Sequence, residues 1–185
     1  MRNVLMVVSG PSGVGKGTLV KKLCSIRSDV VESVSCTTRE PRDGERHGKE
    51  YYFISKDEFF ARIASDDFLE YDEHFGNYYG TPKSFVKEQL KSKSVILEID
   101  VIGGLNAKKA FPNSVLVMIA PPSKEILQAR LSGRNTESKK EIEDRLSRLE
   151  FELEKGAEYD YTVVNDDLCV ALQELGNILD QEKNK

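Results

Sequence analysis

The sequence lacks a long apolar run. Of its 185 residues, only the five from Val4 to Val8 form an apolar stretch ahead of Ser9. A signal peptide needs a longer apolar region and a cleavage site, and a membrane-spanning helix needs about 20 apolar residues. We therefore expect neither a leader nor a membrane anchor, and we expect a cytoplasmic protein.

Cysteine is scarce, and net positive charge is absent. Cys24, Cys36 and Cys169 are odd in number and form no Cys-x-x-Cys pair, which argues against structural zinc and fits a reducing compartment. Acidic residues outnumber basic ones by 31 to 27, and the net charge of −4 argues against a nucleic-acid polymer as partner. Any anionic ligand must be held by local charges.

The sequence has no internal repeat, and its length fits one domain over residues 1–185. Short apolar runs alternate with helical patterns, which is typical of a parallel sheet covered by helices on both faces. We expect strands over residues 3–8, 94–99 and 114–119, with weaker candidates at 30–35 and 161–164. We expect helices over residues 17–26, 83–91, 103–110, 123–132, 138–155 and 166–181.

Several of these helices begin at residues that cap helices well. Ser123 and Asp166 are suitable N-caps, and Ser138 with Glu141 forms a capping box. The helix over 138–155 carries apolar residues at spacings of four, three and four, which predicts one buried stripe made of Ile142, Leu146, Leu149 and Leu153.

Residues 36–82 interrupt the alternation with loops and aromatic runs. We interpret this stretch as a small inserted lobe with antiparallel strands and one short helix that begins at Ser55. A second polar interruption, over residues 133–140, lies between two expected helices and is well placed for a mobile lid.

A glycine-rich segment connects the first expected strand to the first expected helix. Glycines let successive backbone N–H groups face one anion, the helix N-terminus adds further donors, and Lys16 supplies a full charge. The pattern predicts a site for a nucleoside triphosphate, and the alternative is an ordinary glycine turn. The residues of this phosphate loop are Gly10, Pro11, Ser12, Gly13, Val14, Gly15, Lys16, Gly17 and Thr18.

The loop departs from the strict pattern at one position. A Ser or Thr normally follows the lysine and binds Mg²⁺ through its hydroxyl, but Gly17 stands there and Thr18 comes one residue later. We therefore expect Mg²⁺ to be held mainly by phosphate oxygens and water, which this ion tolerates. No residue is assigned as a direct metal ligand.

Two arginines flank a proline in the inserted lobe. Because Pro41 stiffens the turn between Arg39 and Arg42, both guanidiniums are ready to bind one phosphate group, and the hydroxyls of Tyr51 and Tyr79 can add donors. The charges over residues 39–50 sum to zero, so a solvated charged loop is the alternative interpretation.

Taken together, these motifs resemble the guanylate kinase family over essentially the full length. The resemblance implies a three-layer α/β P-loop NTPase fold with a parallel sheet core, an inserted α+β lobe and a helical lid. It divides the chain into a core (1–35, 83–130 and 156–185), a GMP-binding lobe (36–82) and a lid (131–155). The motifs are Ser9 to Lys16, Ser33 to Glu45, Gly48 to Phe53, Phe68 to Glu70, Gly76 to Thr81, Leu97 to Asp100, Arg134 to Glu137 and Val164 to Asp166.

The resemblance implies transfer of a phosphoryl group from ATP to GMP, giving ADP and GDP, in purine nucleotide metabolism. In it, Glu70 accepts from guanine N1–H and the 2-amino group, and the hydroxyls of Ser35 and Thr81 can donate to O6. Adenine offers no such pair of donors, so the site can reject it. The implied GMP site comprises Ser35, Arg39, Arg42, Glu45, Tyr51, Glu70, Tyr79, Thr81 and Asp100.

For catalysis, the resemblance favours Lys16, Arg134 and Arg145 as charges that neutralise the transferring group, with Arg130 and Asn165 on the ATP side. The alternative for the basic residues over 130–148 is a set of surface ion pairs. Two rival functions stay open: a guanylate-kinase-like binding module without activity, and a kinase for another nucleoside monophosphate. Whether the protein is a monomer or a homo-oligomer is not predicted.

Overall fold

The computed structural model describes residues 2–74, 76–132 and 146–185. Its core is a five-stranded parallel sheet in the order β2-β7-β1-β8-β9. Because all the strands are parallel, their carboxyl ends meet at one edge, where loops can form a site. The strands are β1 (Leu5–Ser9), β2 (Val30–Glu32), β7 (Ser94–Glu98), β8 (Val115–Ala120) and β9 (Tyr161–Val164).

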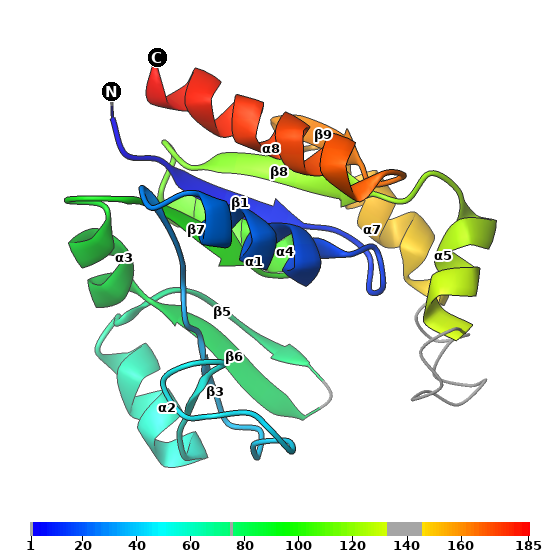
Figure 1. Ribbon diagram of the computed structural model, residues 1–185. Helices are drawn as coiled ribbons and strands as arrows, with labels where there is room; N and C mark the ends of the chain where they lie inside the picture. Colours follow the sequence, from blue (N-terminus) through cyan, green and yellow to red (C-terminus); the bar gives the residue numbers. More distant parts are fainter. Residues whose placement is uncertain (1, 75, 133–145) are drawn as a thin grey trace.

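Strand β1 lies in the centre of the sheet and is apolar on both faces. Leu5 and Val7 pack toward α3 (Lys83–Gln89) and α4 (Val101–Ala110), whereas Met6 and Val8 pack toward the opposite layer. That layer comprises α1 (Lys16–Ile26), α5 (Lys124–Ser132) and α8 (Leu168–Lys183). The helices thus cover both faces, and the expected three-layer α/β fold is confirmed (Figure 1).

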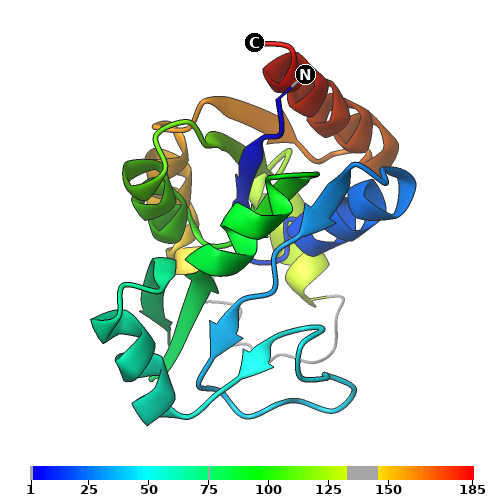
Figure 2. The same cartoon turned by 90° about the vertical axis from the view of Figure 1, so that its left-hand side faces the viewer.

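A second sheet, in the order β4-β3-β6-β5, lies apart from the first (Figure 2). Its strands and its helix are β3 (Cys36–Thr37), β4 (Tyr52–Phe53), α2 (Lys56–Ala64), β5 (Phe68–His74) and β6 (Asn77–Pro82). Phe59 of α2 stacks on Phe68 with ring centroids 4.5 Å apart and forms a small separate core. The expectation of antiparallel strands holds for β3–β6 and β5–β6, but β3 and β4 pair in parallel, because the long loop between them returns the chain in the same direction.

The expected caps are partly confirmed. Ser55 caps α2, and Ser123 accepts from the N–H of Ile126 at 3.3 Å. The cap of α8 is Asp167 and not Asp166, because the carboxylate of Asp167 accepts from the two free N–H groups of the first turn. Helix α4 begins two residues earlier than expected, since Asp100 caps it.

The buried stripe expected over residues 138–155 is wrong at its carboxyl end. Leu149 is buried and Leu146 packs partly against the core, but Leu153 is 38% exposed. In α7 (Leu149–Gly156) the less exposed face includes Leu149, Glu152 and Gly156, so Leu153 lies outside the face that packs on the core. Ile142 and the capping box of Ser138 and Glu141 lie outside the described residues.

The two ends of the described chain lie together at the edge opposite the carboxyl ends of the strands. The N–H of Arg2 donates to the carbonyl of Lys183 at 3.0 Å, which joins the segment before β1 to the end of α8. Across residues 2–74, 76–132 and 146–185, no helix has both the length and the apolar character needed to span a bilayer.

Candidate active site

The glycine-rich loop between β1 and α1 folds as a tight cradle. Gly15 has φ +98°, a left-handed conformation that favours glycine, and it is the N-cap residue of α1. Lys16 is the first residue of the helix, and its ammonium donates to the carbonyls of Gly10 at 2.5 Å and Pro11 at 3.1 Å. The loop therefore places a lysine charge and the amino end of a helix at one point, an arrangement that suits phosphate.

Asn165 and Arg130 support this loop from the side of β9. The side-chain amide of Asn165 is buried and donates to the carbonyl of Val14 at 2.8 Å. The guanidinium of Arg130 donates in turn to the carbonyl of Asn165 at 2.9 Å. The two residues predicted for the ATP side thus lie at the loop, and Asn165 is bound to its backbone.

A cleft of about 360 Å³ lies between the glycine-rich loop and the second sheet. It brings together Lys16 from the loop with Ser35, Tyr51, Glu70 and Tyr79 from the predicted GMP site. Residues far apart in the sequence therefore face one space. The cleft is lined by Gly10, Ser12, Lys16, Ser35, Tyr51, Glu70, Asp72, Tyr79, Glu98, Ile99, Asp100 and Glu152.

Four lining residues were missed by the sequence analysis: Asp72, Glu98, Ile99 and Glu152. A signal existed for Glu98, because a charged residue ending an apolar strand points to the edge where sites form. No sequence signal pointed to Glu152, since a glutamate on a helix is ordinarily a surface charge.

Glu70 is the buried carboxyl of the cleft. It is 7% exposed, and Thr81 donates to its Oε1 at 2.6 Å. Burial raises the pKa of Glu70 to about 7, the bond from Thr81 lowers it, and the nearby charges of Asp100 and Asp72 raise it. Thr81, which was predicted to face the base, here has its hydroxyl on Glu70 and orients that carboxyl.

Arg39 is held in a polar and aromatic setting beside the cleft. Its guanidinium donates to both oxygens of Glu45 at 2.9 Å and lies 5.6 Å from the ring centre of Tyr51. The side chain of Arg42 is exposed and does not line the cleft, although its backbone N–H donates to Glu45 at 2.8 Å. Glu45 therefore fixes the turn that carries both arginines.

Asp100 has two roles in the structure. It lines the cleft together with other residues of the predicted GMP site, and its carboxylate accepts from the N–H groups of Ile102 and Gly103 at 2.8 Å. It therefore fixes the first turn of α4 at the floor of the cleft.

The carboxylate of Glu98 occupies the space beside Gly17. A Cβ built on Gly17 would lie 3.2 Å and 3.4 Å from the two oxygens of Glu98. An acidic group thus stands where the side chain of the expected Ser or Thr would extend. Carboxylate oxygen is a donor that Mg²⁺ accepts, directly or through water, so the residues present fit this ion.

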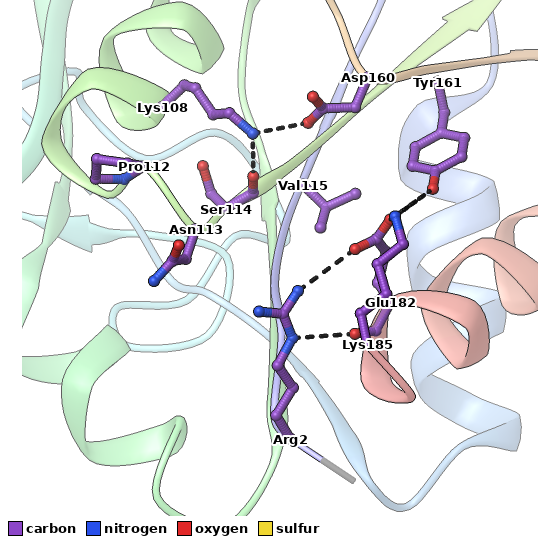
Figure 3. Close-up of a pocket in the computed structure, with 10 residues that line it drawn as sticks. All are labelled: Arg2, Lys108, Pro112, Asn113, Ser114, Val115, Asp160, Tyr161, Glu182 and Lys185. Carbon is purple, nitrogen blue, oxygen red and sulfur yellow. Dashed lines mark hydrogen bonds and ion pairs between the residues drawn. The ribbon is translucent and has the colours of Figure 1, made fainter.

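A second cavity, of about 450 Å³, lies where the chain ends meet (Figure 3). Its cations already have partners: Arg2 and Lys185 pair with Glu182, and Lys108 pairs with Asp160 at 2.9 Å. The cavity contains none of the predicted site residues. We interpret it as a cluster of ion pairs that holds the two chain ends together.

Two predicted catalytic residues, Arg134 and Arg145, lie outside the described residues.

Comparison with known proteins agrees with this geometry. The family profile described as guanylate kinase matches residues 2–182. The guanylate kinase of Synechocystis sp. is 46% identical over 184 residues, which is 99% of this chain and 96% of that protein. The guanylate kinase of Symbiobacterium thermophilum is 46% identical over 183 residues, 98% of this chain and 87% of that protein.

A solved structure gives the same result in three dimensions. The crystal structure of guanylate kinase from Anaplasma phagocytophilum superposes with a TM-score of 0.81 at 34% identity, covering 100% of this chain and 88% of that chain. The sequence motifs, the cleft and these relatives agree, and the chain belongs to the guanylate kinase family.

Proposed function

We propose that the chain transfers the γ-phosphoryl group of ATP to GMP by holding the two nucleotides at opposite ends of the one cleft described above. Its family makes it an ATP-dependent kinase of GMP, with ADP and GDP as products. The observation that carries the residue-level proposal is that Lys16 and Glu70, 54 positions apart, line the same cleft. One nucleotide on each side brings the reacting groups together.

On the ATP side, the backbone from Gly10 to Thr18 binds the phosphates, and Lys16 moves its ammonium from the loop carbonyls to a phosphate oxygen. This exchange replaces neutral acceptors with a charged one, which strengthens the hydrogen bonds. Asn165 keeps the loop in shape because its amide is bonded to the loop backbone, and Arg130 holds Asn165 through its carbonyl.

On the GMP side, Arg39, Arg42, Tyr51 and Tyr79 bind the phosphate. Glu45 orients Arg39 beforehand, so that little side-chain freedom is lost on binding. The incoming phosphate is itself anionic near neutral pH, because its second pKa is about 6. The reaction therefore needs no protein base.

The guanine is selected by Glu70, with Ser35, Thr81 and Asp100 completing the pocket. An ionised Glu70 accepts both donors of the guanine edge, and the bond from Thr81 fixes its orientation. Adenine would place a bare acceptor against this carboxylate, which leaves a buried charge without a donor.

Lys16, Arg134 and Arg145 neutralise the charge that spreads over the transferring group, and Arg130 assists on the ATP side. The roles of Arg134 and Arg145 rest on the family pattern. Mg²⁺ bound with ATP supplies further positive charge at the phosphates, and Glu98 is the side chain placed to hold its water shell.

An acceptor screen tests this proposal. GMP, AMP, CMP and UMP are compared at equal concentration with ATP and Mg²⁺, and ADP formation is followed by a coupled assay. We expect GMP to exceed every other acceptor by at least about 10³-fold in kcat/KM. A faster rate with AMP or CMP would point to a kinase of another nucleotide. No turnover, together with tight binding of a peptide, would point to a binding module. The cytoplasmic location stays a prediction.

A further inference from the structure

The hydroxyl of Tyr159 lies between Ser9, the last residue of β1, and Val101, the first residue of α4. Its single proton is shared between two acceptors, Ser9 Oγ at 2.9 Å and the carbonyl of Val101 at 3.0 Å. Ser9 in turn donates to the carbonyl of Asp100 at 3.1 Å. Ser9 directly precedes the phosphate loop, and Asp100 caps α4 on the guanine side. One phenol thus ties the ATP side of the cleft to the GMP side.

The environment of Tyr159 keeps this hydroxyl neutral and in place. The ring packs against the apolar cluster that includes Leu5 and Val7 of β1. Burial raises the pKa of Tyr159 well above its ordinary value, although the bond with Ser9 lowers it. The phenol therefore keeps its proton and stays a donor throughout the working range of pH. Tyr159 follows α7, which packs beside α4.

The first turn of α4 is shaped around these groups. A Cβ built on Gly104 would lie 1.9 Å from the hydroxyl oxygen of Tyr159, so only glycine lets the phenol reach its partners. On the neighbouring residue, a Cβ built on Gly103 would lie 3.1 Å from Glu70 Oε2. Consecutive glycines weaken a helix relative to alanine. Their presence here is explained by the space that the phenol and the carboxylate need.

We propose that Tyr159 is a positioning residue that aligns the two nucleotides with each other, which rests on the function proposed above. It acts through Ser9 and Val101 and touches neither nucleotide. Transfer requires the donor phosphate and the acceptor phosphate to be in line, and a misplacement of an ångström costs much of the rate. A hydroxyl that fixes the phosphate loop against the first turn of α4 controls that alignment, whereas each nucleotide keeps its own contacts.

The test is Tyr159→Phe, with Tyr161→Phe as matched control. Tyr161→Phe also removes a tyrosine hydrogen bond, here the one to Glu182. Tyr161, however, packs against the core on the opposite face of the sheet. We expect Tyr159→Phe to lower kcat by about tenfold, the scale of losing one hydrogen bond, with the Kd of each nucleotide changed by less than about threefold. Tyr161→Phe should keep kcat within about twofold of wild type. An unchanged kcat in Tyr159→Phe would overturn the proposal, as would equal losses in both variants.

Two further variants keep the test decisive if Tyr159→Phe folds poorly. Ser9→Ala removes one partner of the phenol, and its effect on kcat should be less than additive with that of Tyr159→Phe, because both break the same bond. Gly104→Ala should lower kcat in the wild-type background and lower it less in the Tyr159→Phe background, where the 1.9 Å contact with the hydroxyl is removed and the 2.9 Å contact with the ring carbon stays. Strict additivity in both pairs would refute the link. Wild-type turnover of GMP in the same assay tests the underlying function separately.

Discussion

The buried carboxyl of Glu70 gives GMP binding a pH dependence that can be measured. Its pKa of about 7 means that a large fraction of Glu70 is protonated near neutral pH in the free protein. Guanine donates two hydrogen bonds at this edge, so it binds the ionised carboxylate. The affinity for GMP should therefore rise as the pH rises through 7, and protonation should compete with GMP below it.

The size of the effect follows from the titration. Between pH 8 and pH 6 the ionised fraction of Glu70 falls from about nine-tenths to about one-tenth, so the Kd for GMP should weaken by about tenfold. The phosphate of GMP, with a second pKa of about 6, adds a smaller change of its own. Glu70→Gln retains the phosphate contribution and removes the titrating carboxyl, which makes it the matched control.

Calorimetric titration of GMP at pH 6, 7 and 8 gives the comparison. Glu70→Gln should bind GMP more weakly at pH 8, with ATP binding little changed, and its Kd should vary far less with pH. Thr81→Val should move the wild-type curve to higher pH, since the bond from Thr81 lowers the pKa of Glu70. Equal pH dependence in wild type and Glu70→Gln would refute the reasoning.

The raised pKa of Glu70 also predicts the direction in which the free energy of unfolding changes with pH. The folded protein binds a proton at Glu70 more tightly than the unfolded chain, because the pKa is raised from 4.5 to about 7. The stabilisation from this proton is fully present below pH 4.5 and is lost as the pH rises through 7. The free energy of unfolding should therefore fall by about 3 kcal/mol in all. Urea unfolding of wild type and Glu70→Gln between pH 5 and pH 8 measures it, and a wild-type stability that rises relative to the variant would contradict it.

Three other substitutions test the ATP side. Lys16→Ala should lower kcat by at least about 10²-fold, the scale of one lost transition-state contact, and a rate within about threefold of wild type would contradict this. Glu98→Gln should raise the Mg²⁺ concentration needed for half-maximal activity, and an unchanged metal titration would count against its role beside Gly17. Asn165→Ala leaves the carbonyl of Val14 without its donor and should cost about 1–3 kcal/mol in urea unfolding, with weaker ATP binding; full stability would argue against the support it gives the loop.

Much of the fold was readable from local patterns. Strand β1 is apolar on both faces, so its burial in a parallel sheet followed from sequence, and the run from Gly10 to Lys16 marked the loop that follows it. The stripe ending in Leu153 could not be predicted in the same way, because a helical period identifies an apolar face but not which face packs on the core, and Glu152 is less exposed than Leu153.

The same distinction, between local patterns and tertiary packing, applies to the candidate site. The lysine-bearing phosphate loop and the arginine pair could be predicted from residue types at short spacings, and the resemblance to the family added Glu70 as the carboxylate for guanine. The surroundings of these residues could be seen only in the folded protein. The tertiary structure buried Glu70 enough to raise its pKa, placed Glu98 beside Gly17, bonded Asn165 to the loop and brought Tyr159 to Ser9 across 150 positions. Burial, desolvation and long-range hydrogen bonds depend on how distant segments pack, and no local pattern in the chain encodes that packing.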